Sequence, residues 1–291
     1  MNSLSLLSPA KVNLYLKVIN KRPDGFHNIS TVFERIDLCD VIGLKVTSTD
    51  KVRVFCDHPH VPTGKKNLVV KVARILKEEY GVCKGVDITI KKHIPVAAGL
   101  AGGSSNAATV LMGLNRLWAL KLSKITLLSI ADRIGSDVAF FIHNVSWAVG
   151  TDRGNKIETL NLKSKLWHVI VTPKMKLYSG EVYQALNLRS GPMNILTKKD
   201  DNVTILIHNL RKSNMRGINS FLKNDLESAI LRLKPSLLKL KERLNSLKTL
   251  GVMVSGSGPS VYALVDNKKH ALNLQKVLRK TYSQVFVAQT L

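Results

Sequence analysis

The sequence predicts an α+β fold, because strand-like and helix-like segments are mixed along its 291 residues without regular alternation. Short apolar runs bounded by turn residues predict the first strands, at residues 12–18, 35–44, 51–56 and 86–90. Apolar residues at helical spacing predict helices at residues 68–80, 104–120 and 124–134. A strand-rich beginning whose helices pack on one face is the arrangement of an α+β protein.

The second half of the chain also contains both strands and helices, and the helices cover more of its residues. A strand predicted at residues 144–149 ends the first part of the chain, and the strands predicted in the second part lie at residues 168–172, 250–254, 260–265 and 284–288. One helix is predicted to begin at residue 180, and three others are predicted at residues 215–233, 235–247 and 268–282. The polar turn Gly150–Asn155 precedes this part, so we expect an N-terminal lobe of residues 1–160 and a C-terminal lobe of residues 161–291. The polar stretch Asn187–Asn202 is expected to be an exposed excursion.

The chain is strongly basic, with 44 Lys and Arg against 20 Asp and Glu and a formal net charge of +24. Such a charge favours anionic partners: nucleic acid, an acidic membrane surface or a polyanionic small molecule. The basic residues are scattered and form no tail or aromatic-plus-basic motif, which argues against nucleic acid. No apolar stretch approaches the roughly 18 residues that span a bilayer, so no membrane is expected and the cytoplasm is the predicted location.

The most informative segment is Pro95–Ala108, a loop rich in Gly and Ala that leads directly into a predicted helix. Small residues let the backbone turn through positive φ and bring its N–H groups against an oxyanion. The helix adds unsatisfied first-turn N–H groups and the positive end of its dipole. We therefore predict phosphate as the ligand, with Ser104 or Ser105 as the helix N-cap or as a hydroxyl ligand of a phosphate-bound metal. The alternative is an ordinary Gly-rich turn capped by serine, and the lack of a lysine after the glycines excludes a Walker loop.

Two polar segments flank this loop in sequence. Lys11 and Asn13 alternate with Val12 and Leu14, so both polar side chains are expected on one face of a strand. Either the strand is half-exposed with a solvated lysine, or the two groups share a functional surface. Asp137 follows a predicted helix stop and precedes an apolar run, so its carboxylate is expected to be partly buried. A buried carboxylate needs a cation or donors, and Lys11 is a candidate partner; the alternative is an aspartate that caps a short helix.

Two turns also carry residues suited to ligand binding. Pro23–Asn28 presents Phe26 beside His27, a pair able to stack on a planar base and hydrogen-bond its edge, although such pairs more often serve packing. Near the C-terminus, Ser255–Ser260 is either a plain hairpin turn or a second backbone cradle for a phosphate.

Taken in order, these segments resemble the GHMP kinases over nearly the whole chain, from Pro9 to about Val265. The resemblance rests on Pro-Ala-Lys-x-Asn, Asp-Gly-Phe-His, Gly-Leu-Ala-Gly-Gly-Ser-Ser-Asn-Ala-Ala, Gly-Ser-Asp-Val-x-Phe-Phe and Ser-Gly-Ser-Gly-Pro-Ser. It implies a two-lobed GHMP kinase fold, with a ribosomal-S5-like α/β lobe at the N-terminus and a ferredoxin-like α+β lobe at the C-terminus. Nucleic-acid binders use a fold like the N-terminal lobe, so a binding module is one alternative, and a kinase of this family with another acceptor is the second.

The resemblance implies transfer of the γ-phosphoryl group of ATP to the 2-hydroxyl of the methylerythritol unit of a cytidine diphosphate substrate. By similarity, Asp137 is the base that accepts the hydroxyl proton, while Lys11 holds Asp137 ionised and stabilises charge on the reacting oxygens. The cytidine site carries over to Phe26 as a stacking ring and His27 as a partner of the base edge. The further residues that the resemblance places near the substrate are Asn13, Ser179 and Tyr183.

The resemblance also assigns the ATP phosphates to the loop, with Mg²⁺ bridging them and Ser105 as a metal ligand. The residues expected to contact ATP are Pro95, Val96, Ala97, Ala98, Gly99, Leu100, Ala101, Gly102, Gly103, Ser104 and Ser105.

The chain departs from the family at a few of these positions. Tyrosine is common where this chain has Phe26, so stacking is kept while one hydroxyl is lost. Glycine is frequent where it has Ala97, Ala98 and Ala101, which restricts the loop backbone. The expected partner is the small-molecule substrate, with no nucleic acid and no membrane, and the chain is expected to be a monomer or a weak homodimer.

Overall fold

The computed structural model describes residues 2–186 and 201–291, which form two compact units. The first contains the residues up to Ala10, Cys39–Val96 and Ala101–Asn144. The second contains Lys11–Leu38, Ala97–Leu100 and Val145–Leu291. Two long strands, β1 (Ser3–Lys21) and β2 (His27–Thr47), contribute residues to both. The units are therefore interleaved in sequence, whereas the predicted lobes divide the chain once, and the boundary near residue 160 stays a prediction.

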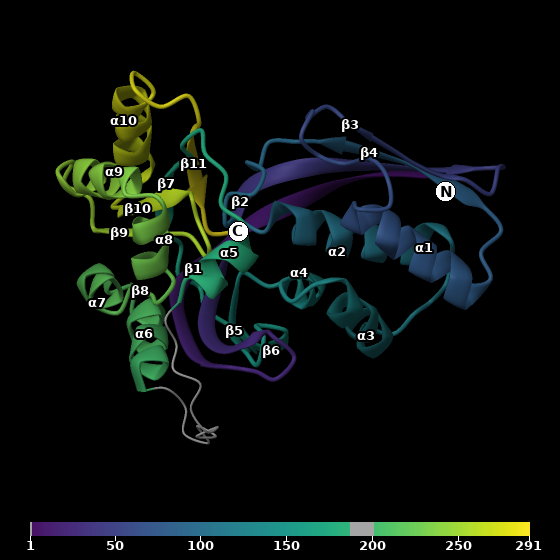
Figure 1. The fold of residues 1–291 in the computed structure, drawn as a ribbon, viewed down its shortest axis with the longest axis horizontal. Helices are drawn as coiled ribbons and strands as arrows, with labels where there is room; N and C mark the ends of the chain where they lie inside the picture. The colour runs from purple at the N-terminus through teal and green to yellow at the C-terminus, as the bar shows by residue number, and fades with distance from the viewer. Residues whose placement is uncertain (1, 187–200) are drawn as a thin grey trace. The chain divides into compact units, whose positions relative to one another are not determined.

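The first unit is built on a sheet in which β4 (Gly85–Lys91) lies between two other strands. β4 pairs antiparallel with the C-terminal part of β2 and parallel with β3 (Val52–Cys56). Val86, Ile88 and Ile90 recur at every second position of β4 and are buried, as a strand with one covered face requires. Figure 1 shows the helices of this unit on one side of these strands: α1 (Leu68–Tyr80), α2 (Gly102–Leu117), α3 (Lys124–Ile134) and α4 (Val138–His143).

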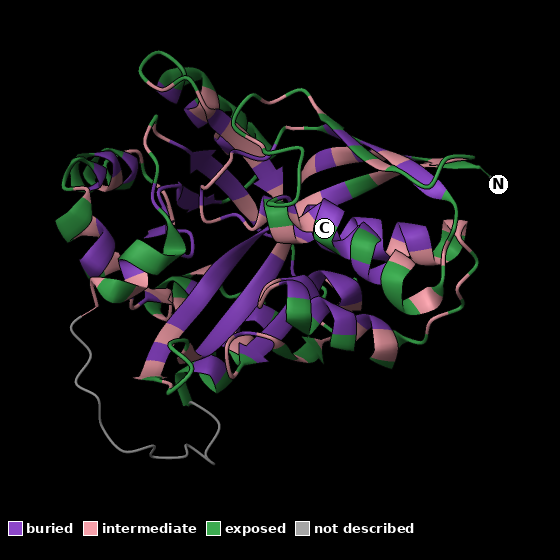
Figure 2. Cartoon of the chain, turned by 45° about the vertical axis from the view of Figure 1, so that its right-hand side comes forward, coloured by how far each residue is buried: buried purple, intermediate pink, exposed green. Residues whose placement is uncertain are grey.

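Helix α2 packs directly on this sheet. A Cβ atom at Gly113 would lie 2.5 Å from Leu44 Cδ1 and 3.0 Å from Leu6 Cδ1, so the helix approaches the strands too closely for a side chain. Local signals set the ends of α1: the Asn67 side chain caps its start, and Gly81 ends it in the left-handed conformation. The predicted helices at 68–80 and 124–134 are confirmed. Figure 2 shows buried faces on the helices opposite exposed ones.

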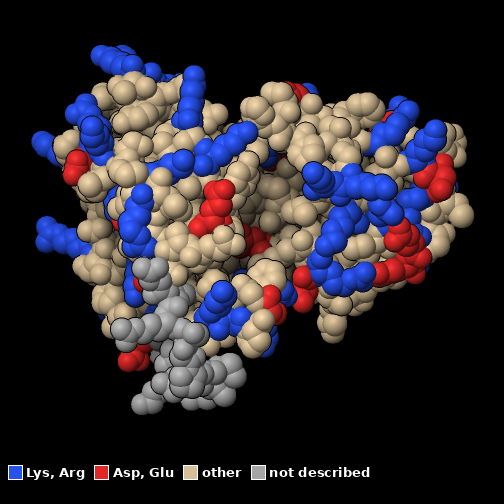
Figure 3. Space-filling model, viewed as in Figure 1, with Lys and Arg blue, Asp and Glu red and all other residues tan. Residues whose placement is uncertain are grey.

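Ion pairs lie on the surface of the first unit. Arg53 pairs with Asp87 (Nη2–Oδ2 2.6 Å) and lowers the pKa of that carboxyl below its ordinary value. Arg133 does the same for Glu79 (Nη2–Oε1 2.6 Å). On the face drawn in Figure 3, Lys and Arg are scattered and several lie beside Asp or Glu. Exposed ion pairs are screened by water and contribute little to stability, so burial rather than these pairs holds the fold.

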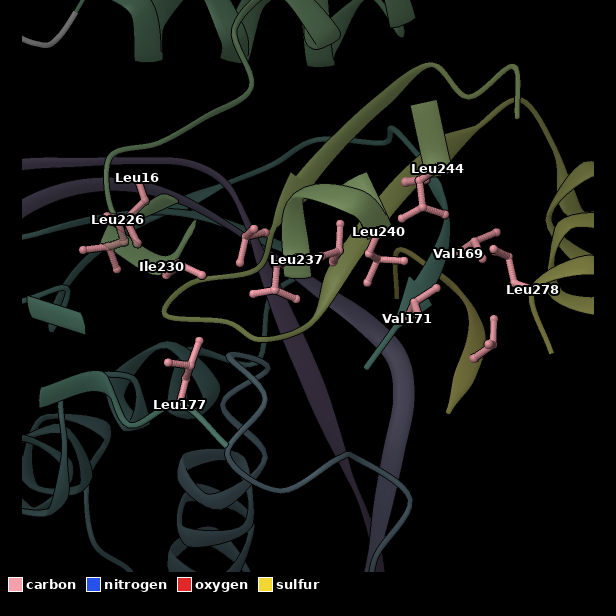
Figure 4. Packing of buried hydrophobic residues seen from close by; sticks show 14 of the residues in the cluster. Leu16, Val169, Val171, Leu177, Leu226, Ile230, Leu237, Leu240, Leu244 and Leu278 are labelled. Carbon is pink, nitrogen blue, oxygen red and sulfur yellow. The ribbon is translucent and has the colours of Figure 1, made fainter. Parts of the chain in front are cut away.

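The second unit contains a four-stranded antiparallel sheet with the order β11-β7-β10-β9. β7 lies between β10 and β11 in this sheet. Helices connect β7 to β9 and β10 to β11 along the chain. This is the predicted ferredoxin-like topology. In Figure 4, Leu237, Leu240 and Leu244 of α9 belong to the same buried cluster as Val169 and Val171 of β7. The elements are β7 (Trp167–Val171), α8 (Glu227–Leu233), α9 (Ser236–Asn245), β9 (Gly251–Val254), β10 (Val261–Val265), α10 (Lys268–Leu278) and β11 (Val285–Gln289).

In the second unit, further strands pair with β1 and β2 or with each other. Thr31 of β2 lies opposite Gly150 of β5 (Trp147–Thr151), and β5 pairs in turn with β6 (Lys156–Leu160). β1 pairs in parallel with the short strand β8 (Lys223–Asn224). The remaining helices are α5 (Ser179–Gln184), α6 (Asp201–Arg211) and α7 (Met215–Ser220). No helix within residues 2–186 and 201–291 is long and apolar enough to cross a bilayer.

The continuous helix predicted at residues 215–233 is wrong, because the chain forms α7, β8 and α8 there. Tertiary hydrogen bonds explain the break. The Asn224 side chain donates to the carbonyls of Val254 (2.9 Å) and Gly256 (2.8 Å), and Asp225 Oδ2 accepts from the Val18 N–H (2.9 Å). These partners lie far away in sequence, so the helical pattern of apolar residues does not reveal them.

Two smaller differences concern the middle of the chain. Residues 187–200 of the predicted excursion lie outside the described residues, and its last residues belong to α6, which the polar composition did not predict. The strand predicted from residue 144 begins instead at Trp147, because Asn144 ends α4 with a left-handed φ of 53°.

Substitution of Asn224 by alanine should destabilise the second unit, because two buried carbonyls lose their donor and the Leu226 N–H loses its acceptor (3.0 Å). We expect the free energy of unfolding to fall by about 2–4 kcal/mol in urea titrations. The matched control Asn273→Ala, on an exposed position of α10, should change it by less than about 0.5 kcal/mol. Equal losses in the two variants would contradict the role given to Asn224.

Candidate active site

The loop from Pro95 to Ser105 leaves the β4 region and enters α2. Ala97, Gly99 and Ala101 have φ angles of 53°, 75° and 55°, so every second residue of this stretch is left-handed. Alternation of hand along a backbone turns successive N–H groups toward one concavity, which is how main chains bind anions. A left-handed alanine costs about 1–2 kcal/mol, so the surrounding structure holds the loop in a shape that its sequence alone does not favour.

Helix α2 begins at Gly102, with Ala101 as the N-cap and no side chain capping it, so the predicted cap at Ser104 or Ser105 is wrong. The start of the helix is displaced toward the loop because Gly102 fits against its neighbours: a Cβ there would lie 2.9 Å from Ile94 Cγ2. Uncapped first-turn N–H groups and the helix dipole together make an anion site.

The two serines of this helix have different surroundings. Ser105 is fully buried, and its hydroxyl bonds to that of Ser8 (Oγ–Oγ 2.8 Å), whereas Ser104 is partly exposed. The predicted metal ligand Ser105 therefore already has a hydrogen-bond partner, and its metal-binding role stays a prediction. Within the described parts of the chain, no three His, Cys, Asp or Glu side chains gather as a metal site.

In the second unit, residues 97–100 of the loop pack against the turn Ser255–Ser260. Ser255 Oγ donates to the Gly99 carbonyl (3.0 Å), and the Ser260 N–H donates to the Ala98 carbonyl (3.3 Å). A Cβ on Gly99 would lie only 2.0 Å from the Ser255 carbonyl oxygen. The turn is thus more than a plain hairpin connection, because it holds the loop by backbone contact.

Lys11 and Asn13 are buried next to this turn. The Lys11 N–H donates to the Leu100 carbonyl (3.1 Å), and Lys11 Nζ donates to Asn13 Oδ1 (2.7 Å). Their exposed fractions are 4% and 1%, so the alternative of a solvated lysine is wrong. A Cβ on Gly256 would lie 3.6 Å from Lys11 Nζ and 3.3 Å from Asn13 Oδ1, which places this part of the turn against both polar groups.

The sequence did not reveal the residues that fix Asn13. Its Nδ2 donates to Thr31 Oγ1 (2.7 Å), Thr31 Oγ1 donates to the Tyr15 carbonyl (2.6 Å), and Tyr262 Oη donates to the Asn13 carbonyl (2.9 Å). Burial raises the pKa of the Tyr262 hydroxyl well above its ordinary value, so it remains a donor. A threonine in a strand and a buried tyrosine look like ordinary core residues, and only their partners identify them.

Phe26 and His27 lie at the turn between β1 and β2, also in the second unit. Phe26 is 49% exposed, and the Arg153 guanidinium lies 4.9 Å from its ring centroid. His27 stacks on Tyr183 of α5, with ring centroids 4.9 Å apart and an interplanar angle of 25°. Burial, with a smaller effect of Lys21, lowers the pKa of His27 below its ordinary value of 6.5, so the imidazole is neutral at neutral pH.

Two neighbours hold these rings in place. Arg22 pairs with Asp24 (Nη2–Oδ2 3.1 Å) and with Asp152, which ties the turn to the end of β5. Ser179, at the start of α5, bonds to Ser257 (Oγ–Oγ 2.8 Å), so the helix that carries Tyr183 is linked to the turn after β9.

Asp137 belongs to the first unit, where it occupies the N-cap position of α4. It is partly buried, as predicted, and its side chain makes no capping hydrogen bond, so it does not serve as a helix cap. The helix that follows is buried along Val138–Ile142, and this apolar anchor fixes the backbone that carries the carboxylate. Lys11 lies in the second unit, so the predicted pairing of Lys11 with Asp137 stays a prediction.

A left-handed loop that leads into a helix N-terminus, with a buried lysine bonded to that loop, is suited to binding phosphate groups. Comparison with known families agrees: residues 67–144 match the GHMP kinases N terminal domain, and residues 206–284 match the GHMP kinases C terminal domain. The chain belongs to the GHMP kinases.

Relatives over the full length narrow the comparison. The 4-diphosphocytidyl-2-C-methyl-D-erythritol kinase of Exiguobacterium sibiricum is 37% identical over 98% of this chain and 96% of its own length. That of Bacillus subtilis is 38% identical over 97% and 95%. A crystal structure of 4-(cytidine 5'-diphospho)-2C-methyl-D-erythritol kinase superposes with a TM-score of 0.81 at 29% identity and covers 98% of both chains.

Gly99→Ala should disable the loop without unfolding the protein. The added Cβ would meet the Ser255 carbonyl at 2.0 Å and must push the loop and the turn apart. A displacement of this kind should lower kcat/KM for ATP by about 10²-fold in a steady-state assay. Gly64→Ala is the control, because its Cβ has nothing within 4 Å. Wild-type kinetics in the Gly99 variant would refute the close approach.

Proposed function

We propose that this chain transfers the γ-phosphoryl group of ATP to the 2-hydroxyl of 4-diphosphocytidyl-2-C-methyl-D-erythritol, a step of non-mevalonate isoprenoid precursor synthesis. The observation that carries the proposal is the relationship over 97–98% of the chain to kinases that bear this substrate's name. It is a phosphotransferase with an alcohol acceptor, and ATP is its phosphate donor.

The loop and the start of α2 hold the ATP phosphates. Backbone N–H groups between Pro95 and Ser105 supply the donors, and the left-handed residues Ala97, Gly99 and Ala101 curve the backbone around the anion. Mg²⁺ bound to ATP would neutralise part of the phosphate charge. Ser104, which is partly exposed, and Ser105, which is fully buried, are the candidate hydroxyl ligands.

Asp137 accepts the proton of the acceptor hydroxyl, and Lys11 stabilises charge on the reacting oxygens. The support for Lys11 is its burial and its bond to Asn13, which together orient the ammonium group. The support for Asp137 is its partly buried position at the start of a buried helix. Proton removal by a positioned carboxylate makes the hydroxyl a better nucleophile as the phosphoryl group is transferred.

The cytidine base binds at Phe26, His27 and Tyr183. A half-exposed phenyl ring offers a stacking face, and a neutral imidazole offers both a donor and an acceptor to the edge of cytosine. Asn13 and Ser179 contact other parts of the substrate. The Ser179 hydroxyl lies beside Ser257, and the Asn13 amide lies beside Lys11.

Two rival functions differ in what they require. A nucleic-acid-binding module has no use for a buried lysine joined to asparagine at an anion loop. A GHMP kinase with another acceptor would share the loop but not the rings that suit a base. The absence of a nucleic-acid partner, the monomeric or weakly dimeric state and the cytoplasmic location stay predictions.

One assay separates these functions. ADP release, coupled to an optical readout, is followed with 4-diphosphocytidyl-2-C-methyl-D-erythritol, homoserine, mevalonate and galactose as acceptors. We expect turnover with the first alone. Turnover with another acceptor would assign the chain to a different member of the family, and release with none would contradict the kinase function.

Asp137→Asn should lower kcat by about 10² to 10⁴-fold, because the amide cannot accept the proton. The dissociation constant for ATP, measured by calorimetry, should change little. Asp132→Asn, an exposed position on α3, is the control and should leave both quantities unchanged. Near-normal turnover in the purified Asp137 variant would remove this residue from the mechanism.

Binding of the cytidine substrate should weaken in acid through His27. Because burial lowers its pKa, the ring is neutral above about pH 6.5 and becomes protonated only below it. KM for the cytidine substrate should therefore be flat from about pH 8 to pH 6.5 and rise at lower pH. His27→Gln should raise KM and abolish this rise, and a rise that persists in the variant would assign the titration to another group.

A further inference from the structure

A fully buried carboxylate, Asp40, lies in the first unit, where it contacts residues at both ends of the phosphate-binding loop Pro95–Ser105. Its Oδ1 accepts from the backbone N–H groups of His93 and Ile94, each at 2.8 Å. Its Oδ2 accepts from Asn106 Nδ2 at 2.9 Å and forms an ion pair with Lys92. Neither the proposed chemistry nor the family resemblance uses this group, although a buried charge is costly unless it is fully paired.

The partners of Asp40 lie at the two ends of the loop. Lys92, His93 and Ile94 are the last residues before Pro95, where the chain enters the loop. Asn106 lies in α2, immediately after Ser105, where the chain leaves it. One carboxylate therefore ties the entry of the loop to its exit.

Further hydrogen bonds hold the residues at which the loop enters α2. Asn106 Nδ2 also donates to Ser8 Oγ (2.9 Å), and Ser8 Oγ bonds to Ser105 Oγ (2.8 Å). Gly102 is packed against the entry segment, since a Cβ there would lie 2.9 Å from Ile94 Cγ2 and 3.2 Å from Lys92 Nζ. The first residues of α2 are thus held against residues 92–94 with little room to move.

The charges of Asp40 and Lys92 affect how well an anion binds at the start of α2. A lone carboxylate beneath the start of the helix would repel a phosphate, and the Lys92 ammonium, itself almost fully buried, cancels that repulsion. The cluster is therefore neutral, and its contribution to phosphate binding is to hold the loop in shape.

We propose that Asp40 is a positioning residue that clamps both ends of the phosphate loop, so that the backbone N–H groups of the loop face the ATP phosphates. This inference rests on the proposed function, since it assumes that the loop binds a nucleotide. It predicts selective loss of affinity for phosphates when the clamp is weakened, because adenosine has no phosphate for the backbone N–H groups of the loop to bind.

Asp40→Asn separates geometry from charge. The amide keeps the size of the side chain, but its Nδ2 group cannot accept from Asn106, and Lys92 loses its counter-charge. Electrostatics alone predicts tighter ATP binding, because a negative charge is removed and a positive one stays. The clamp predicts weaker binding, so the sign of the change decides between them.

The experiment measures dissociation constants by calorimetry for ATP, ADP and adenosine, together with KM for the cytidine substrate. In Asp40→Asn we expect the constants for ATP and ADP to rise by about 10 to 100-fold, the range seen when groups that orient ligand-binding residues are removed. The values for adenosine and for the cytidine substrate should stay within about twofold of wild type, whereas a general loosening of the protein would raise all four.

Two more variants keep the test decisive. Asn106→Leu removes the hydrogen bond to Asp40 at the end of the loop without changing any charge. It should also weaken the binding of ATP and ADP selectively, so it tests the clamp if Asp40→Asn does not fold. Val72→Ala removes buried volume from α1 and should lower the melting temperature with nucleotide affinity unchanged. Unchanged or tighter ATP binding in Asp40→Asn, or in Asn106→Leu where only that variant folds, would overturn the clamp. A wild-type protein that binds neither ATP nor ADP would instead overturn the proposed function.

Discussion

The approach of two backbones, at Gly99 and Ser255, is the constraint on which the second unit's part of the site depends. A side chain at Gly99 would meet the Ser255 carbonyl at 2.0 Å, so only glycine permits this distance. The contact places the turn after β9 against the loop, and the next turn residue, Gly256, then lies beside Lys11 and Asn13. Segments near residues 11, 99 and 255 meet in this way, although more than 80 residues separate each from the next.

Lys11 and Asp40 are tolerated as buried charges because hydrogen bonds or ion pairs satisfy them. Lys11 bonds to Asn13, whose own amide bonds to Thr31 and whose carbonyl accepts from Tyr262. Asp40 is paired and hydrogen-bonded at both oxygens. A network of this kind rigidifies the groups it contains, since the loss of one partner leaves a buried donor or acceptor unsatisfied. Rigidity of this kind favours catalysis in general, because a preorganised charge needs no reorganisation during a reaction.

Local signals explain which elements could be predicted. The helices at 68–80 and 124–134 have side-chain caps at Asn67 and Ser123 and are followed by Gly81 and Gly135, so the information lies within a few residues. The ferredoxin-like sheet was implied by the family resemblance, and the strand order confirms it. The helix at 215–233 failed because Asn224 and Asp225 form hydrogen bonds with Val254 and Val18, and sequence periodicity contains no term for such partners.

The sequence by itself determined which groups are candidates for the site: a small-residue loop, Lys11, Asp137 and the Phe26–His27 turn all stand out by residue type and spacing. Only the tertiary structure decided how these groups are held. It made Lys11 a buried donor to Asn13, started α2 at Gly102 without a serine cap, stacked His27 on Tyr183 and placed Asp40 under both ends of the loop. The physical reason is range: turn chemistry and periodicity act over a few residues, whereas burial and hydrogen-bond partners are set by segments that meet only when the chain has folded.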